Sequence, residues 1–331
     1  MHLYAGKHVL FITTKNLDYL RNTQEIAKLR ESAASVDVLG SSEKSYVRRL
    51  LHVYGKLSTM SLKQYDTIFV GFAPQLILPL FGWRFRKKTV VIDFFISVYD
   101  TMIQDRKKWK DGSMLAKFCH WIDRSTLRRA DHIISDTNAH GDYFAKEFGI
   151  DRAQIETWYL CADRTIFYPR PQKKLAELQD KFVVLYFGSV LPVQGVDVIM
   201  QAMQLLANDP RIHFDFIGPI AQKVKNAEGD NITYINWLSQ PELAEVISRA
   251  DLCLAGHFNR ENGKANRTIP GKAYIYEAME KPMILGDSPA NHERYSAGQE
   301  GITFVEMGDP EALRNAILSC MEQWQKKSQE N

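Results

Sequence analysis

Residues 267–287 read RTIPGKAYIYEAMEKPMILGD, and this stretch decides the fold. Pro270 suits the first turn of a helix, where its missing N–H costs nothing. Lys281-Pro282 ends that helix, because the residue before a proline disfavours the helical conformation. The apolar run 283–285 then predicts a short buried strand that ends at Gly286-Asp287. The stretch therefore predicts a loop, a helix, a tight turn and a buried strand.

The same stretch carries groups that suit an anion. Lys272 lies near the start of the predicted helix and Glu277 near its middle. A helix N-terminus is electropositive, so Lys272 and Arg267 beside it suggest a bound phosphate. Glu277 could then hold a sugar hydroxyl. The alternative is that Lys272 and Glu277 are solvated on an ordinary amphipathic helix, and local chemistry leaves both interpretations open.

Outward from this stretch, short apolar runs alternate with helical patterns along the whole chain. The predicted strands of the first half are 7–13, 35–39, 67–71, 89–93 and 131–135, and those of the second half are 182–187, 213–217, 232–235, 252–254 and 302–305. Continuous apolar strands that alternate with helices are typical of parallel sheets covered on both faces. The sequence therefore predicts an α/β protein.

A proline-rich, charged segment separates the two series and suits an interdomain linker. We expect an N-terminal domain over 1–165, a linker over 166–180, a C-terminal domain over 181–309, and a closing helix over 310–331 that packs back toward the N-terminal domain. A length of 331 residues is sufficient for two domains, each with its own core.

The composition is that of a soluble globular protein, with 45% apolar and 24% charged residues. No apolar run approaches the roughly 20 residues of a transmembrane helix. The N-terminus leads directly into a strand rather than into a signal peptide, and the four cysteines are scattered without a C-x-x-C pair. We therefore expect a cytoplasmic protein.

Charge is distributed unequally between the two halves. Residues 1–170 carry 26 Lys and Arg against 18 Asp and Glu, a net charge of +8, whereas residues 171–331 carry 16 against 21, a net charge of −5. Such a division indicates that the first half faces an anionic partner.

Two loops of the second half are candidates for ligand contacts. The turn from Gly188 to Gly195 follows a predicted strand and precedes a helix, where backbone N–H groups can surround a phosphate. In isolation such a turn is more often a simple connection. Trp237 and Leu238 also follow a strand, and they either flank a nucleotide base or cover the edge of the domain.

Taken in order, several motifs resemble one family. They are the glycine turn, the Trp237 loop with its Glu-Leu helix, Ala250-Asp251-Leu252, and the E-A-M-x-x-P of 277–282. Over about 180–327 this order resembles the retaining glycosyltransferases of family 4, which have the GT-B fold, and especially their polysaccharide-type members. The resemblance implies two Rossmann-like domains with a cleft between them. It also implies a nucleotide-sugar co-substrate, UDP- or GDP-linked, on the C-terminal domain, and a glycan or lipid-linked acceptor on the N-terminal one. We expect no further cofactor, and no metal because the chain has no D-x-D motif.

The resemblance also implies roles for individual residues. Glu277 is expected to hold the ribose, the loop with Trp237 and Leu238 to meet the base, and Gly188 and Ser189 to approach the diphosphate or the donor sugar. Gln194 and Gly195 complete the donor-binding turn.

Three positions depart from the family pattern. Ile269 stands where a glutamate is usual, Ser189 where an arginine is usual, and Gln194 where a lysine is usual. Both usual diphosphate cations are therefore missing from the glycine turn, although a dianionic leaving group still needs compensation. We expect Arg267 and Lys272 to supply it, both as donor-binding and as catalytic groups.

In the first half, Asp93 ends a predicted strand near the place where the family has a histidine that points into the cleft. A carboxylate there is a candidate acceptor-binding or catalytic base, and the alternative is a helix N-cap. Tyr99, Asp100 and Arg106 are further acceptor-binding candidates.

Basic clusters at 83–88, 106–110 and 124–129 lie close to aromatic residues, beside the apolar stretch 72–83. Such a combination suits an anionic membrane surface, at which the protein would be peripheral on the inner face. The alternative is a set of solvated helix and loop faces. Nucleic acid is not expected, because no nucleic-acid-binding module accompanies the clusters.

The leading hypothesis is a metal-independent retaining hexosyltransferase of cell-surface polysaccharide or glycoconjugate synthesis. One rival is a non-catalytic GT-B-fold partner subunit of a glycosyltransferase complex, which Ile269, Ser189 and Gln194 favour and which Lys272 and Glu277 oppose. The other is a nucleotide-sugar epimerase or a phosphorylase on the same architecture.

Overall fold

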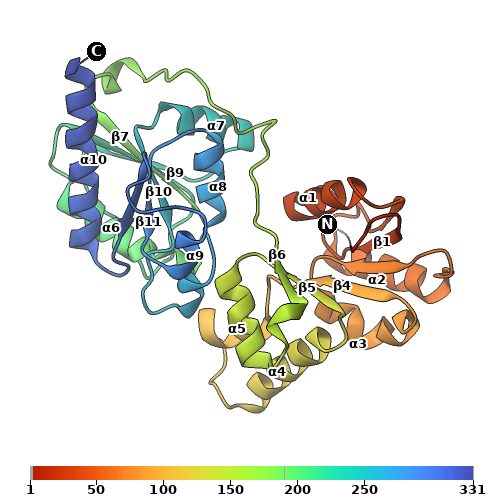
Figure 1. Ribbon diagram of the computed structural model, residues 1–331. Helices are drawn as coiled ribbons and strands as arrows, with labels where there is room; N and C mark the ends of the chain where they lie inside the picture. Colours follow the sequence, from red (N-terminus) through yellow and green to blue (C-terminus); the bar gives the residue numbers. More distant parts are fainter. Residues whose placement is uncertain (1–2, 190, 331) are drawn as a thin grey trace. The chain divides into compact units, whose positions relative to one another are not determined.

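The computed structural model describes residues 3–189 and 191–330, with the side chains of 328–330 left aside. The chain forms two compact units, Met1–Leu160 and Cys161–Asn331. Each unit contains a parallel six-stranded sheet with helices packed against it (Figure 1). The prediction of an α/β protein with two Rossmann-like domains is confirmed.

The first sheet has the strand order β2-β1-β3-β4-β5-β6, with every pair parallel. Its strands are β1 (His8–Ile12), β2 (Ser35–Leu39), β3 (Thr67–Val70), β4 (Thr89–Asp93), β5 (His132–Ser135) and β6 (Ile155–Thr157). The helices between them are α1 (Leu20–Arg30), α2 (Tyr46–Thr59), α3 (Leu78–Phe81), α4 (Met114–Leu127) and α5 (Asn138–Phe148). Short helical turns are η1 (Pro74–Leu76), η2 (Gly82–Phe85), η3 (Asp100–Asp105) and η4 (Arg152–Gln154).

The helices of this unit cover both faces of the sheet, as continuous apolar strands require. On one face, α1 packs through Ile26 and Leu29 in a cluster that includes Trp158. On the other face, α2, α3, α4 and α5 share a larger cluster that includes Val53 and Leu78. Figure 1 shows α2, α3 and α4 on the same side of this sheet.

The second sheet has the order β12-β11-β10-β7-β8-β9, again parallel throughout. Its strands are β7 (Phe182–Phe187), β8 (Ile212–Ile217), β9 (Ile232–Ile235), β10 (Leu252–Gly256), β11 (Met283–Gly286) and β12 (Ile302–Val305). The helices are α6 (Val196–Leu205), α7 (Gln240–Arg249), α8 (Gly271–Ala278), α9 (Pro289–His292) and α10 (Pro310–Glu330), with short turns η5 (Ala176–Leu178), η6 (Pro192–Gln194) and η7 (Gly263–Asn266).

The stretch 267–287 forms the crossover from β10 to β11. Pro270 is the N-cap of α8, and β11 is buried along its whole length. Because α8 connects two parallel strands, its N-terminus lies at the carboxyl edge of the sheet, where ligands of such sheets gather.

The units divide at Leu160 and Cys161, earlier than the expected limit at 165. The expected linker is attached to the second unit. Lys174 forms an ion pair of 2.6 Å with Asp251, and Gln172 donates a hydrogen bond of 2.9 Å to the same carboxylate.

The closing helix α10 has its buried face inside the second unit. Leu313, Ile317 and Met321 of this helix belong to the core cluster that also contains α6. This face of α10 is therefore not available to the N-terminal domain. The expected packing of the helix toward that domain stays a prediction. Over residues 3–189 and 191–330, none of the helices has both the length and the apolar character needed to span a membrane.

We predict that Asp251→Ala lowers the free energy of unfolding by roughly 2–4 kcal/mol. The carboxylate accepts the N–H of Val183 at 2.8 Å as well as the groups of Lys174 and Gln172, so its loss leaves buried donors without an acceptor. Urea unfolding of the full chain measures the change, with the exposed Asp230→Ala as the control. Equal midpoints for the two variants would contradict the prediction.

Candidate functional site

The central feature of the second unit is a buried lysine at the start of α8. Lys272 is the second residue of this helix, and only 6% of it is exposed. Its Nζ donates a hydrogen bond to Oε1 of Gln194 and lies 4.3 Å from the centroid of the Tyr186 ring. Burial lowers the pKa of Lys272 to about 7. Among the residues that the structure describes, no carboxylate forms an ion pair with it.

Three glycines lie at the ends of neighbouring strands, and two of them, Gly188 and Gly256, border this ammonium group. The three are Gly188 after β7, Gly218 after β8 and Gly256 at the end of β10. A Cβ on Gly188 would lie 3.3 Å from the Lys272 Nζ, and one on Gly256 would lie 3.4 Å from it. A Cβ on Gly218 would lie 2.0 Å from the Gly188 carbonyl oxygen. The absence of side chains at 188 and 256 thus leaves space beside the ammonium, and its absence at 218 lets the backbone after β8 approach Gly188.

The predicted donor turn belongs to the same site. Gln194 ends the turn η6 and contacts Lys272 directly. Gly195 has φ of +66°, and a Cβ there would lie 2.6 Å from the carbonyl carbon of Phe258, so a larger residue would be strained. The structure therefore brings Gly188, Gln194 and Lys272 together, and Ser189 lies exposed next to Gly188.

The other predicted cation and the departure at Ile269 lie in the segment before α8. Arg267 follows η7, with its Nη1 3.0 Å from the position of a Cβ on Gly263. Ile269 is buried, so this position presents no charge to the lysine. The role of Arg267 at the diphosphate stays a prediction.

The predicted ribose carboxylate is held by two neighbours. Glu277 accepts hydrogen bonds from Arg294 at 2.8 and 2.7 Å and from the Tyr295 hydroxyl at 3.0 Å. The hydrogen bonds to Glu277 raise the pKa of Arg294. The Glu277 side chain is still 36% exposed, so it is oriented and open to a ligand. Arg294 and Tyr295 lie 17 and 18 positions away in the chain, and no motif pointed to them.

The loop after β9 leaves its tryptophan uncovered. Trp237 is 75% exposed, and Leu238 is partly exposed. Ser239 and Glu242 form a capping box that fixes the start of α7. Trp237 therefore does not cover a core edge of its own unit, which leaves its contact with a base as a prediction.

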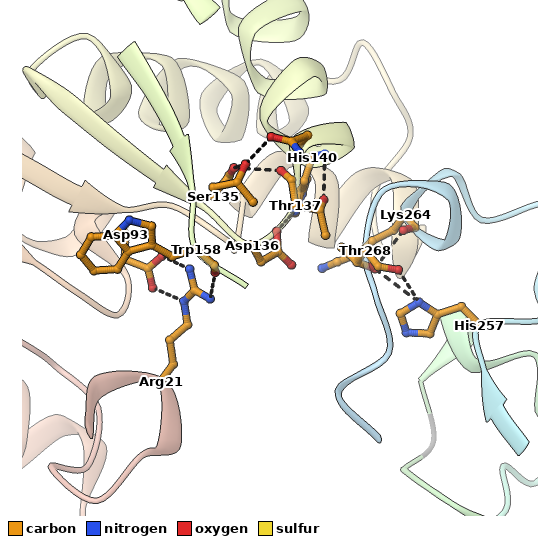
Figure 2. A network of polar contacts seen from close by, with 12 residues as sticks. Arg21, Asp93, Ser135, Asp136, Thr137, His140, Trp158, His257, Lys264 and Thr268 are labelled. Atoms are coloured by element: carbon orange, nitrogen blue, oxygen red, sulfur yellow. Dashed lines mark hydrogen bonds and ion pairs between the residues drawn. The ribbon is translucent and has the colours of Figure 1, made fainter. Parts of the chain in front are cut away.

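In the first unit, Asp93 forms an ion pair with an arginine from α1. Arg21 donates from Nε to Oδ2 at 2.7 Å and from Nη2 to Oδ1 at 2.6 Å, and its Nη1 reaches the Trp158 carbonyl at 3.1 Å (Figure 2). Both Asp93 and Arg21 are buried. Glu25, also buried, lies 3.4 Å from the same guanidinium, and burial followed by the Asp93 charge raises its pKa well above the usual range.

The structure shows that Asp93 is not a helix N-cap, because the next helical element is capped by Tyr99. Both of its oxygens bind a buried guanidinium, and its role as a base or an acceptor ligand stays a prediction. Its function here is to tie β4 to α1. Arg21 was missed because it lies 72 positions before Asp93 in the chain.

The further acceptor candidates lie mostly inside the unit as well. The Tyr99 hydroxyl donates to Asp111 at 2.9 Å, and its N–H donates to Asp123 at 2.8 Å. Asp100 is fully buried at the start of η3, whereas Arg106 is exposed just after it. Tyr99 and Asp100 are buried, and the acceptor contacts expected of Tyr99, Asp100 and Arg106 stay predictions.

Asp123 on α4 organises the loop that follows Asp93. Its carboxylate accepts from the Ser97 hydroxyl at 2.7 Å, from Gln75 Nε2 at 2.9 Å and from two backbone N–H groups. Burial raises its pKa despite these hydrogen bonds. A carboxylate in the middle of an amphipathic helix gave no sign of this function in the sequence.

Each unit has a buried histidine close to the end of a strand (Figure 2). His140 lies in the first turn of α5, after β5, and His257 directly follows β10. His140 Nδ1 lies 2.6 Å from the Asp136 carboxylate, while Thr137 caps α5. His257 Nδ1 lies 3.1 Å from the Thr268 carbonyl, just before α8. Over the described residues, no cluster of His, Cys, Asp and Glu is arranged to hold a metal ion.

Comparison with known proteins places these features in context. Residues 181–323 match the family model described as glycosyl transferases group 1. Over 136 residues the chain is 29% identical to the probable glycosyltransferase WbjE of Pseudomonas aeruginosa, an alignment that covers 39% of this chain and only 34% of that relative.

Solved structures match nearly the whole chain. Sucrose-phosphate synthase from Thermosynechococcus elongatus is 16% identical, with a TM-score of 0.64 over 96% of this chain and 90% of that one. Anabaena HepE, solved with UDP and glucose, is 15% identical, with a TM-score of 0.65 over 97% and 91%. A putative UDP-N-acetylglucosamine 2-epimerase from Listeria monocytogenes is 12% identical, with a TM-score of 0.53 over 96% and 88%. Such low identities show the fold alone, which is GT-B.

We predict that Lys272→Met stabilises the ligand-free protein at low pH. The unfolded lysine stays protonated up to its usual pKa of 10.5, but the folded one only below about 7. The unfolded chain therefore binds more protons between these values, so the stability of the natural protein rises with pH there. At pH 6 the variant should be more stable by about 1 kcal/mol or more, and the difference should shrink toward pH 9.

Urea unfolding at a series of pH values measures this effect. Lys225→Met, at an exposed position of the same unit, is the matched control and should leave the pH profile unchanged. If the stability of Lys272→Met and that of the natural protein change with pH in parallel, the pKa of Lys272 is not lowered in the folded protein.

Proposed function

Because residues 181–323 carry a glycosyl transferases group 1 domain on a GT-B fold, we propose that the protein is a glycosyltransferase that uses a nucleotide-sugar donor. The observation that carries this proposal is Lys272, a buried cation at a helix N-terminus that has no anionic partner among the described residues. A diphosphate is the kind of ligand that such a position stabilises.

In this proposal the donor diphosphate lies at the start of α8. The Lys272 ammonium and the first N–H groups of the helix face it, and glycine at 188 and 256 lets its oxygens approach the backbone. When the bond between the sugar and the diphosphate breaks, negative charge grows on the leaving oxygen. A cation fixed in a desolvated site stabilises that charge more strongly than water does.

Glu277 and Trp237 complete the donor site. The carboxylate of Glu277, oriented by Arg294 and Tyr295, accepts a ribose hydroxyl, and the exposed Trp237 stacks on the base. Uridine is the base we propose, because HepE of the same fold was solved with UDP. Retention of configuration and a glycan or lipid-linked acceptor in cell-surface polysaccharide synthesis rest on the family resemblance.

The neighbours also show why the fold alone does not decide the reaction, since a putative epimerase shares it. The match to the glycosyl transferases group 1 family favours transfer over epimerisation. No specific observation favours a non-catalytic partner subunit.

Calorimetry with UDP, GDP and ADP tests the donor class. We expect UDP to bind, and we expect Lys272→Met to weaken it by about tenfold or more, because a charge-assisted contact to phosphate is lost. Lys225→Met should bind as the natural protein does. If the natural protein binds none of the three nucleotides, the proposal is wrong. If the Lys272→Met variant binds UDP as tightly as the natural protein does, the phosphates lie elsewhere.

A second experiment tests the ribose contact. The natural protein should bind UDP more tightly than a UDP analogue that lacks the 2′- and 3′-hydroxyls, and Glu277→Gln should lose about tenfold of that preference, because the charged acceptor is gone. Asp287→Asn, at an exposed position just after β11, is the control, since its carboxylate pairs with His292 instead. If Glu277→Gln keeps the full preference for UDP over the analogue, Glu277 does not bind the ribose and only orients Arg294.

A further inference from the structure

We propose that the outer face of α2, α3 and α4 in the first unit is a membrane-binding surface for anionic lipid. The prominent part of this surface is an apolar ridge on α4, made of Met114, Leu115, Phe118 and Trp121. These side chains are 79%, 49%, 56% and 57% exposed. Since vesicle binding needs neither donor nor acceptor, this inference does not depend on the proposed transferase activity.

The ridge is unusual because α4 is apolar on two opposite sides. Its inner side packs Ala116, Cys119 and Leu127 into the core of the unit. Met114, Phe118 and Trp121 follow at helical spacing along the other side, and the rings of Phe118 and Trp121 stack with centroids 5.9 Å apart. A surface helix ordinarily places polar residues there, so four neighbouring large apolar side chains indicate a binding site.

The neighbouring helices extend the surface. Val47 and Leu51, one turn apart on α2, are 64% and 63% exposed. Between α2 and α4, Leu80 of α3 and Trp83 of η2 are 55% and 66% exposed. The three helices lie on the same side of the sheet, with Tyr54 of α2 against Phe81 of α3 at 5.3 Å between ring centroids (Figure 1).

Cations border the ridge, and they identify the partner as anionic. Lys117 and Arg124 on α4 and Arg128 just after it are exposed, and no acidic residue of α4 other than the buried Asp123 accompanies them. Below Trp83, a cavity of about 430 Å³ is lined by Arg86, Lys88 and Arg129 against a single carboxylate, Asp131. Apolar side chains bordered by cations match a bilayer, whose acyl chains lie beneath anionic headgroups.

The apolar stretch 72–83 had suggested membrane contact in the sequence, but its side chains are mostly packed inside. Ile77 and Leu78 are buried in the core, and of the large apolar residues in this stretch the most exposed are Leu80 and Trp83. The ridge on α4 supplies the larger exposed area.

Sedimentation with lipid vesicles tests the proposal on the full chain. We expect binding to vesicles of phosphatidylcholine mixed with phosphatidylglycerol, and weaker binding to phosphatidylcholine alone or in high salt. The double variant Phe118→Ser/Trp121→Ser should bind the mixed vesicles at least about tenfold less tightly. Lys117→Glu/Arg128→Glu should lose the preference for anionic lipid.

The matched controls change the same residue types in the second unit. Leu205→Ser removes an apolar side chain that is 48% exposed, and Lys225→Glu reverses an exposed charge, so both should bind vesicles as the natural protein does. Unchanged circular dichroism and an unchanged urea unfolding midpoint in each ridge variant confirm that it is folded.

Two results would overturn the proposal. One is a failed sedimentation test, in which the natural protein binds no vesicle or the Phe118→Ser/Trp121→Ser variant binds vesicles as well as the natural protein. The other is that light scattering finds the natural protein dimeric and the ridge variant monomeric, which would assign the ridge to contact between copies of the chain.

Discussion

The burial of the Lys272 ammonium is the constraint on which the second unit depends. A charge that is removed from water must find an opposite charge or lose its proton, and this lysine has an amide oxygen and an aromatic ring instead. A side chain at Gly188 or Gly256 would fill the space beside the ammonium, and one at Gly218 would meet the Gly188 carbonyl oxygen. The fold thus keeps a buried lysine that has no carboxylate partner among the described residues.

In the first unit, by contrast, buried charged groups have partners of opposite charge or several hydrogen-bond donors. Arg21 is balanced by Asp93, and the Asp123 carboxylate is enclosed by donors from the loop it organises. Groups that are satisfied in this way fix the positions of chain segments and are poor candidates for chemistry. The unit instead leaves apolar side chains uncovered, on the outer side of α4. The buried lysine and the exposed apolar side chains therefore belong to different units.

Much of the fold could be predicted from the sequence, because its apolar runs are continuous and its helices are delimited by residues such as Pro270 and Pro282. Lys272 was predicted as a ligand group because position in a helix is a local property. The pairing of Asp93 with Arg21 could not be predicted, because Arg21 comes from a distant helix. The ridge on α4 was missed because an apolar pattern predicts a packed face but does not tell which of two apolar faces is packed.

The depressed proton affinity of Lys272 links the binding of an anion to the uptake of a proton. With a pKa of about 7, part of the population carries a neutral amine at neutral pH. A phosphate beside it would favour the ammonium form and so draw a proton from the solvent. The heat of nucleotide binding would then change with the ionisation enthalpy of the buffer, and the affinity would decline as the solution becomes alkaline.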